Sequence, residues 1–593
     1  MFEMCMSFTL WAILMPATPY YEGRYSVIGP PGTGKTTFLA DRTARSVEAG
    51  DTVCLCSLTT AAAREILRRN IPVPPEAVGT LHAHAYRAIG RPKVISKADI
   101  DEWNEQNPAW RMSGIDTASD MVGTGREQGD VLLRRLDLCR HRQTPEQSRP
   151  TDVVGFGALW AAWKDERDVV DFTDMIELAL QETRSAPESP NVIMADEAQD
   201  LSRLEYNLLS QWARWARAMI VVGDPDQALF CWRGADPTIF RDPIIPDEHR
   251  GVLEQSYRVP REVHRVATAW IKRLTDYQPI EYLPRDADGA VHACEATAKY
   301  PEPMVTLAQR HLDAGQSVMI LASANYLLHA TLHVLRREAI PFSNPWRVTR
   351  GDWNPLVQGS TKRVTATDRV LSWLRPTEGV EDVHDEWCPY CAGHRITADG
   401  TRCEKCFKYT SNPRWSHEDV ARWLDPLASK GTLATGAKTA VAQKLRTFMN
   451  REACFKITDE EIMLLADPQC AAWLRTMNAG SLDIPEAVTW YMQHLLVSRS
   501  KPLDFPLRVA EQRGLRALTT PPKLYVGTIH SVKGGEADVV FVLPDISYAA
   551  WRAMDTDEGK DAVTRMFYVA ATRARETLYL CSPGTRMAVQ IAA

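Results

Sequence analysis

The stretch Gly29-Pro-Pro-Gly-Thr-Gly-Lys35-Thr36 decides the fold of this chain. It fits the pattern G-x-x-x-x-G-K-[ST], follows the apolar run Tyr25–Ile28 and precedes a helical pattern at Phe38–Glu48. A strand, a glycine-rich turn and a helix in this order form a phosphate-binding loop, in which backbone N–H groups and the helix N-terminus surround an anion. The alternative is an ordinary Gly-Pro turn before a helix. It is disfavoured because both the motif and its position between a strand and a helix fit a phosphate-binding loop. The sequence therefore predicts a nucleotide-binding α/β protein.

Further apolar runs indicate a second core of the same kind. Continuous buried strands that alternate with helices are typical of parallel sheets covered on both faces. Helical patterns follow the first three runs of the first half, among them Ala61–Asn70. Besides Tyr25–Ile28, the expected strands are Val53–Cys56, Val192–Ala195, Met219–Val222, Val252–Gln255, Val318–Leu321, Leu524–Thr528, Val539–Leu543 and Leu578–Cys581.

Two segments without strand-like runs interrupt these cores, and both contain tryptophan. We therefore expect two α/β cores, each split by a mainly helical insertion. The expected divisions are 1–85 and 171–250 for the first core with its insertion at 86–170, and 251–350 and 520–593 for the second core with its insertion at 351–519.

Length and charge restrict the function classes. The 593 residues exceed what one hydrophobic core accommodates, which is about 250–300 residues. The chain has 69 basic and 75 acidic residues, so its formal net charge is −6. A protein that coats nucleic acid usually has a basic excess. If this chain binds nucleic acid, its positive charge must be concentrated in a groove.

The sequence favours a cytoplasmic protein without a membrane segment. It contains no uninterrupted apolar stretch of about 18 residues, which a transmembrane helix requires. The apolar run Met4–Pro16 is flanked by Glu3 and lacks the basic residues of a secretory signal, so we expect it to be buried. An odd number of cysteines, 13, is typical of a reducing compartment rather than of a disulfide scaffold.

An acidic pentapeptide, Asp196-Glu-Ala-Gln-Asp200, follows the expected strand Val192–Ala195. Carboxylates at the C-terminal end of a parallel strand face the ligand crevice. Beside a phosphate-binding loop, Asp196 and Thr36 are placed to hold Mg²⁺, and Glu197 is placed to polarise the attacking water. A solvated acidic turn is the alternative, and the phosphate-binding loop makes it the weaker one.

The two motifs together resemble a superfamily 1 helicase of the UvrD/Rep/PcrA type. The remaining motifs of that family occur in its order between residues 24 and 582. They are Ser57-Leu-Thr-Thr-Ala-Ala-Ala-Arg64-Glu65, Gly79-Thr-Leu-His82, Gly223-Asp-Pro-Asp-Gln227-Ala-Leu-Phe-Cys-Trp232-Arg-Gly-Ala235, Gln255-Ser-Tyr-Arg258, Gly527-Thr-Ile-His530-Ser-Val-Lys533-Gly-Gly-Glu536 and Arg565-Met-Phe-Tyr-Val-Ala-Ala-Thr-Arg573-Ala574.

The resemblance implies two RecA-like P-loop NTPase cores and ATP hydrolysis between them. Its catalytic positions are Lys35, Glu197, Gln227, Arg258 and Arg573, the last two acting as arginine fingers from the second core. The ATP-binding positions are Gly29, Pro30, Pro31, Gly32, Thr33, Gly34, Lys35, Thr36, Thr37, Asp196, Tyr257 and Glu536. Gln106 is the first glutamine of the sequence, so the adenine-reading glutamine common upstream of the loop in this family has no counterpart, and strict ATP preference is not implied.

The resemblance also implies an ATP-driven helicase or translocase that moves 3′→5′ along single-stranded DNA. Its substrates would be single-stranded DNA and tailed or forked duplexes, in replication, repair or recombination, with proteins of those pathways as possible partners. Trp232 is the best candidate for a base-stacking ring. The DNA-contacting positions carried over are Thr59, Thr80, His82, Trp232, Arg233, Thr528 and His530.

Four cysteines form a separate motif in the second insertion. Cys388 and Cys391 precede Cys403 and Cys406 in the spacing C-x₂-C-x₁₁-C-x₂-C, which suits a structural zinc ribbon near 384–410. Disulfide pairs are the alternative. Our hypothesis is that the ribbon helps the insertion engage duplex DNA, and a plain solvated ribbon face is the alternative. We expect the other nine cysteines to be core thiols.

Two further functions stay open at this point. A translocase that strips proteins from DNA without processive unwinding would carry the same motifs. A non-catalytic nucleic-acid-binding or initiation scaffold on a decayed ATPase is disfavoured, because all catalytic positions are intact.

Overall fold

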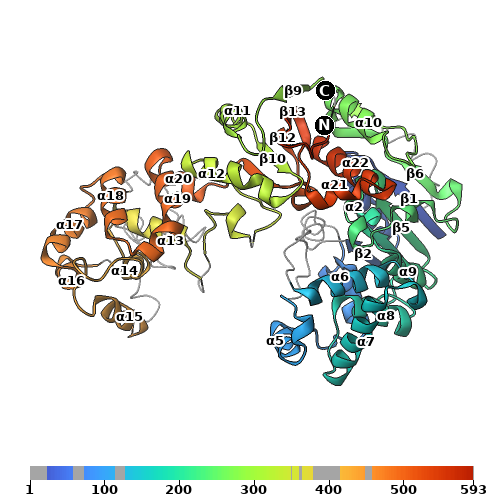
Figure 1. The fold of residues 1–593 in the computed structure, drawn as a ribbon, viewed down its shortest axis with the longest axis horizontal. Helices are drawn as coiled ribbons and strands as arrows, with labels where there is room; N and C mark the ends of the chain where they lie inside the picture. The colour runs from blue at the N-terminus through green and yellow to red at the C-terminus, as the bar shows by residue number, and fades with distance from the viewer. Residues whose placement is uncertain are drawn as a thin grey trace. The chain divides into compact units, whose positions relative to one another are not determined.

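The computed structural model describes residues 23–57, 72–113, 127–348, 350–359, 363–377, 414–447 and 457–591. The chain divides into two compact units, which are described separately (Figure 1). Unit 1 consists of Met1–Lys299, Val318–Leu327 and Gly527–Ala593, and unit 2 consists of Tyr300–Ser317 and Leu328–Val526.

The first sheet of unit 1 has six strands in the order β3-β2-β4-β5-β1-β6. All of its strand pairs are parallel. The four strands expected in the first half are confirmed, and β3 and β6 extend the sheet on either side. The bounds are β1 Gly23–Ile28, β2 Val53–Ser57, β3 Val78–Thr80, β4 Val192–Ala195, β5 Ala218–Gly223 and β6 Arg250–Val252.

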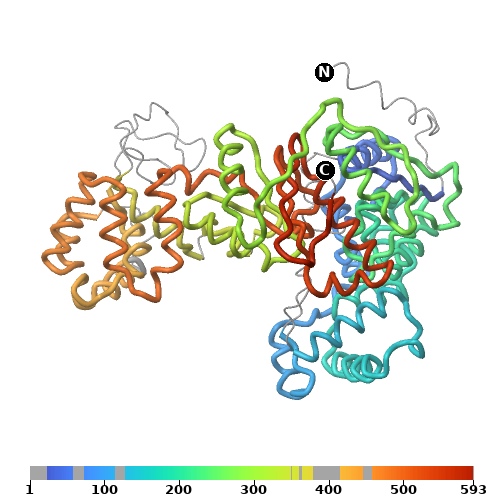
Figure 2. Tube along the Cα trace, turned by 45° about the horizontal axis from the view of Figure 1, so that its top comes forward, coloured from blue at the N-terminus to red at the C-terminus, as the bar shows by residue number. Residues whose placement is uncertain are grey.

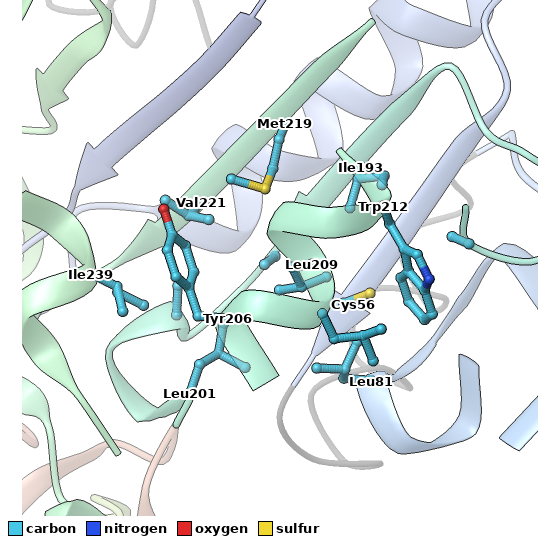
Figure 3. Packing of buried hydrophobic residues seen from close by; sticks show 14 of the residues in the cluster. Cys56, Leu81, Ile193, Leu201, Tyr206, Leu209, Trp212, Met219, Val221 and Ile239 are labelled. Carbon is cyan, nitrogen blue, oxygen red and sulfur yellow. The ribbon is translucent and has the colours of Figure 1, made fainter. Parts of the chain in front are cut away.

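Helices cover both faces of this sheet. Alternate residues of β4 divide between two cores, because Val192 and Met194 pack with Phe38 of α2 (Lys35–Glu48), whereas Ile193 packs on the other face. Figure 3 shows that second face, where Ile193 lies among Leu209 and Trp212 of α9 (Arg203–Trp212) and other apolar side chains. Burial on both faces explains why the strands are apolar throughout rather than alternating.

The described residues between β3 and β4 are mainly helical, with one isolated parallel bridge between Val94 and Val170. Their core is a group of buried aromatic rings, in which Trp103 packs edge-to-face on Trp160 and Trp163 with centroids 4.8 and 5.6 Å apart. Figure 2 shows these helices, drawn in blue and cyan, gathered on one side of unit 1. They are α4 Leu81–Ala88, α5 Lys97–Gln106, α6 Gln128–His141, α7 Thr151–Glu166 and α8 Phe172–Glu182.

The second sheet has five strands in the order β11-β10-β12-β13-β9. The pairs β10–β12, β12–β13 and β13–β9 are parallel, which confirms a second parallel α/β core. On this core Trp270 of α10 donates its indole N–H to the carbonyl of Thr564 in α22 at 2.8 Å. The bounds are β9 Ala290–Cys294, β10 Val318–Ala322, β11 Leu524–Thr528, β12 Ala537–Val542, β13 Ala574–Cys581, α10 Arg261–Ile271, α21 Tyr548–Ala553 and α22 Asp557–Ala571.

One expected strand, Val252–Gln255, is wrong as placed. β6 ends at Val252 and pairs with β1 of the first sheet, whereas a separate strand, β7 (Gln255–Pro260), begins at Gln255 and pairs with β8 (Leu283–Arg285). The apolar pattern runs through both strands, and only their tertiary partners separate them. The first sheet therefore extends to Val252.

Unit 2 is built from helices around a group of tryptophan rings. Trp373 is fully buried and stacks on Tyr491 and Trp415 with centroids 4.6 and 5.2 Å apart. Its indole N–H donates to the carbonyl of Ala487 at 3.1 Å. Figure 2 shows the helices of residues 414–513, drawn in orange, in one compact group. The helices of this unit are α11 Glu302–Asp313, α12 His329–Arg337, α13 Ala366–Leu374, α14 His417–Leu424, α15 Ala437–Thr447, α16 Asp459–Leu465, α17 Pro468–Asn478, α18 Ile484–His494, α19 Val497–Arg513 and α20 Arg516–Thr519.

Among the helices that the structure describes, none combines the length and the apolar character needed to span a bilayer.

Candidate active site

The phosphate-binding loop connects β1 to α2 within unit 1. Gly32 and Gly34 have φ values of 78° and 81°, a backbone region that favours glycine. A Cβ at Gly32 would also lie 2.5 Å from Cβ of Arg258, so any other residue here would displace the strand that carries this arginine. Glycine is therefore required both by the turn and by the approach of β7.

Lys35 begins α2 and points back over the loop, where its ammonium donates to the carbonyl of Gly29 at 2.7 Å. Burial lowers the pKa of Lys35, and the carboxylates of Glu197, Asp224 and Asp196 oppose that effect. The loop thus presents one positive charge that faces a set of buried carboxylates.

Two of these carboxylates stand directly after β4. Asp196 is 3% exposed, and its carboxylate accepts the backbone N–H of Glu197 at 2.9 Å. Burial, with the charge of Glu197, raises the pKa of Asp196 to about 7. Burial would also raise the pKa of Glu197, but the charges of Lys533 and Lys35 outweigh it and lower that pKa to about 2. The charges of Lys35 and Lys533 also lower the pKa of Asp196, but they do not outweigh burial and the charge of Glu197.

Gln199 links the acidic turn to the loop after β5. Its side-chain N–H donates to Glu197 at 2.5 Å, and its carbonyl oxygen accepts the backbone N–H of Asp224 at 3.0 Å. Gly223 makes room for it, because a Cβ there would lie 2.1 Å from that oxygen. Asp224 in turn accepts the side-chain N–H of Gln227 at 2.6 Å.

Arg573 reaches Gln227 from the second sheet of unit 1. It precedes β13, it is 2% exposed, and its guanidinium donates to the side-chain oxygen of Gln227 at 2.9 Å. Two further N–H groups donate to the carbonyls of Val569 and Gly535 at 3.0 and 3.1 Å. Burial and the charge of Arg258 lower the pKa of Arg573 to about 9. All three atoms that accept hydrogen bonds from the guanidinium are uncharged, so neutral groups hold it in place.

Lys533 is a second cation from the same side. It lies 3.4 Å from the carboxylate of Glu197, it donates to Asp200, and it donates to the backbone carbonyl of Gln227 at 3.3 Å. Burial would lower the pKa of Lys533, but Asp200 and Glu197 raise it above its usual value. Asp200 is 1% exposed, so this ion pair is buried.

Arg258 lies on β7 beside the phosphate-binding loop. The backbone N–H of Tyr257 donates to the carbonyl of Gly32 at 2.8 Å, which fixes the strand against the loop. The side chain of Arg258 donates to Glu536 at 2.6 Å. Tyr257 is 47% exposed, and the hydroxyl of Tyr282 donates to the carbonyl of Pro31 at 2.9 Å.

The structure thus brings the five predicted catalytic positions into unit 1 around one loop. The remaining predicted nucleotide-binding residues lie in or beside that loop, with Pro30, Pro31 and Thr33 buried, Thr36 half-buried in the first turn of α2, and Thr37 exposed.

Several side chains expected on DNA gather around Phe230, which is buried. The centroids of the Trp232 and His530 rings lie 6.5 and 6.1 Å from that of Phe230. The guanidinium of Arg233 lies 5.8 Å from the same ring. Trp232 itself is 40% exposed, so it is a surface ring rather than a core residue.

His82 and Arg233 share one buried carboxylate. Glu205 of α9 is 1% exposed, and its carboxylate lies 3.9 Å from Nδ1 of His82 and 3.8 Å from the guanidinium of Arg233. Burial raises the pKa of Glu205, but Arg233 outweighs that effect and lowers it to about 2. Burial lowers the pKa of His82.

Two of the three threonines expected on DNA have a structural use. The hydroxyl of Thr80 accepts the backbone N–H of Ala83 at 3.1 Å and caps α4. The hydroxyl of Thr528 accepts the backbone N–H of Ser531 at 3.3 Å and caps a short 3₁₀ helix, Ile529–Val532. Both therefore position the histidine that follows them two residues later.

Some predicted residues lie outside the described residues. These are Thr59 with most of its motif, the expected helix Ala61–Asn70, the run Met4–Pro16, and the cysteines Cys388, Cys391, Cys403 and Cys406.

Sequence reasoning assigned no role to Asp200, Lys533, Glu205 or Tyr282. Asp200 and Lys533 belong to motifs quoted in the sequence analysis, and that membership alone could have indicated a role for them. Glu205 completes a capping box with Ser202, a pattern that indicates only a helix start. Nothing in the sequence around Tyr282 indicates its contact with the loop.

Comparison with known proteins agrees with this geometry. Residues 17–232 match a family model described as an AAA domain, and residues 523–581 match one described as a UvrD-like helicase C-terminal domain. The first match includes the phosphate-binding loop, the acidic turn and Gln227, and the second includes Lys533 and Arg573.

Distant relatives cover most of the chain. The ATP-dependent DNA helicase PcrA of Staphylococcus epidermidis is 23% identical over 95% of this chain and 82% of its own length. The PcrA proteins of Bacillus subtilis and Leuconostoc citreum are 23% and 26% identical over 70% and 44% of this chain, and over 59% and 38% of their own lengths. Both matched models, these relatives and the geometry of the site lead to one conclusion: the chain is an enzyme, an ATP-dependent DNA helicase, and it is similar to UvrD-like superfamily 1 helicases.

Proposed function

We propose that this enzyme hydrolyses ATP at the loop of Lys35 and uses the energy to move 3′→5′ along single-stranded DNA, separating duplex DNA ahead of it. The direction rests on the motif resemblance, and the DNA substrate rests on that resemblance and on the relatives, which are ATP-dependent DNA helicases. The observation that carries the proposal is the hydrogen bond from Arg573 to Gln227, because it joins the two sheets at the catalytic site.

The residues of the site suit phosphoryl transfer to water. Lys35 would neutralise the β- and γ-phosphates, and Glu197, ionised at neutral pH, would orient and polarise the attacking water. Arg573 and Arg258 would stabilise the charge that builds up on the transferred phosphoryl group. Preorganised cations in a dry site do this without reorganisation, which is why such groups contribute strongly.

A divalent cation fits the donor set at Asp196. This buried carboxylate accepts one backbone N–H, and burial with the charge of Glu197 raises its pKa despite Lys35 and Lys533, so the charge of Mg²⁺ would favour its ionised form. Asp196 and Thr36 are the residues that would hold the ion. When bound, Mg²⁺ would neutralise phosphate charge.

Coupling to nucleic acid would pass through the segment from Gln227 to Arg233. Gln227 contacts Arg573 at one end of this segment, and three residues later Phe230 packs near Trp232 and His530. A change in the position of Gln227 on hydrolysis would therefore move the exposed ring of Trp232. When a cleft closes and opens in each hydrolysis cycle, movement between two DNA contacts advances the enzyme along the strand.

The surface of Trp232 suits a strand of any sequence. Stacking of a base on an aromatic ring contributes about 1–3 kcal/mol and tolerates every base. Arg233, His82 and His530 would contact the backbone nearby. This local arrangement explains how a chain with a net charge of −6 binds DNA without a global positive charge.

The direct test compares the unwinding of 3′-tailed and 5′-tailed duplexes with ATP and with GTP. We expect strand separation of the 3′-tailed duplex alone, because the resemblance to helicases of the UvrD/Rep/PcrA type implies 3′→5′ movement. Unwinding of the 5′-tailed duplex alone would contradict the polarity. DNA-stimulated hydrolysis without unwinding of either duplex would favour a translocase that strips proteins, and the GTP arm measures nucleotide preference.

A further inference from the structure

Two cysteines and a histidine meet in the core of unit 1, outside the nucleotide site. Cys54 and Cys56 lie on β2 and His84 lies on α4, and all three are buried. One ligand atom from each can be chosen so that all three lie within 4.8 Å of one another. The sequence alone indicated only dispersed core thiols, because His84 is 28 residues further along the chain.

Local structure explains how the three side chains meet. Residues i and i+2 of a strand point to the same face, so both thiols face the layer that contains α4 (Figure 3 labels Cys56 beside Leu81 of that helix). Gly79 precedes α4, and a Cβ at this position would lie 3.2 Å from Nε2 of His84. The glycine therefore leaves room for the imidazole against β2.

Two of the three distances between ligand atoms of the cluster match those between ligands of one metal ion. Sγ of Cys54 lies 3.9 Å from Sγ of Cys56 and 3.5 Å from Nδ1 of His84. Tetrahedral zinc with Zn–S of about 2.3 Å and Zn–N of about 2.0–2.1 Å has S···S and S···N edges of about 3.8 and about 3.6 Å. Both observed distances lie within about 0.2 Å of these edges.

Groups around the cluster orient the imidazole of His84. Nε2 of His84 lies 3.3 Å from the carbonyl of Leu55, an arrangement that fixes metal-binding histidines and leaves the other nitrogen toward the ion. Arg87 donates to that nitrogen at 2.8 Å and to the carbonyl of Glu76 at 2.6 Å. On metal binding Arg87 would release the imidazole and stay beside the thiolates as a counter-charge.

We propose that Cys54, Cys56 and His84 form a binding site for one thiophilic d¹⁰ metal ion, Zn²⁺ or Cu⁺. Two thiolates and an imidazole are the donor set that these ions prefer. The ion would tie β2 to α4, the helix that begins with the capping residue Thr80 and carries His82. The site is independent of the ATPase chemistry proposed above, since none of its side chains contacts a catalytic side chain.

The test measures metal content in the purified full-length chain after loading with Zn²⁺, and separately with Cu⁺ under reducing conditions. The variants are Cys54→Ala and His84→Gln, the second of which keeps an acceptor for Arg87. Cys470→Ala is the matched control, because Cys470 is a buried cysteine 4.0 Å from a single histidine, His494. Metal held elsewhere in the chain cancels in the comparison.

We expect each cluster variant to contain about one equivalent less metal than the wild type and the control, in at least one of the two arms. Equal metal content in all four proteins in both arms would overturn the proposal. ATP hydrolysis by the variants reports separately on the proposed function.

Discussion

Lys35→Ala is expected to lower the turnover of ATP by about 10³-fold, the scale of losing one preorganised charge in a dry site. The ammonium of Lys35 is the only cation that α2 directs over the loop, and its carbonyl partner, Gly29, belongs to the loop itself. Without this ammonium, the negative charge of the ATP phosphates would face the carboxylates of Glu197, Asp224 and Asp196. Phosphate release at saturating single-stranded DNA measures the effect.

Arg45→Ala is the matched control for this variant, because Arg45 lies on the same helix and pairs on the surface with Asp41 at 3.0 Å. We expect it to keep wild-type turnover. Lys35→Ala should keep the wild-type Tm, because it removes a charge whose pKa is already lowered by burial. Turnover within tenfold of the wild type in a folded Lys35→Ala protein would contradict the assignment of the loop.

Arg573→Ala is expected to lower turnover by about 10³–10⁵-fold, the scale of an arginine finger. Its guanidinium is held by Gln227 and by the carbonyls of Val569 and Gly535, so its position is fixed before reaction. Binding of ATP should change much less than turnover, because the charge that Arg573 stabilises develops mainly in the transition state. Single-turnover hydrolysis and equilibrium nucleotide binding separate the two effects.

The control for Arg573 is Arg552→Ala on α21, since Arg552 is exposed and faces Asp555 across one helical turn. Arg573→Lys should restore only a small part of the activity, because an ammonium cannot make the three directed contacts of the guanidinium. A loss in ATP affinity equal to the loss in turnover would show that Arg573 binds the ground state and is not an arginine finger.

The parts of the site that the sequence predicts are those whose residues are adjacent in the chain. The turn from β1 to α2 and the acidic turn after β4 are each set by local sequence, because the apolar strand, the glycines and the first helical residues occur together. Parallel pairing then brings the two turns to the same edge of the sheet. This is why the common location of Lys35, Asp196 and Glu197 was predictable, whereas their chemistry stays a prediction.

Tertiary partners decide what could not be predicted. The stretch 252–255 reads as one strand, yet its two ends pair with β1 and with β8 in different sheets. The contact of Lys533 with Asp200 joins residues 333 positions apart, and no pattern within either motif specifies it. Glu205 likewise reads as a capping residue, and its position between His82 and Arg233 follows from packing.

Thr80 and Thr528 show how a family motif can carry two roles. The resemblance places them on DNA, and the structure shows that both hydroxyls cap helices. A capping threonine satisfies a backbone N–H and contributes about 1 kcal/mol, so these positions are explained in part by stability. The histidines that follow, His82 and His530, are then the better candidates for contact with the strand.

The central claim is that one site couples nucleotide hydrolysis to nucleic acid. Its most direct test is the rate of ATP hydrolysis by the wild-type chain with and without single-stranded DNA, at saturating ATP and Mg²⁺. We predict slow hydrolysis without DNA and at least a tenfold increase with it (about 1.4 kcal/mol in activation free energy). Hydrolysis at the same rate with and without DNA, or none in either case, would contradict the account.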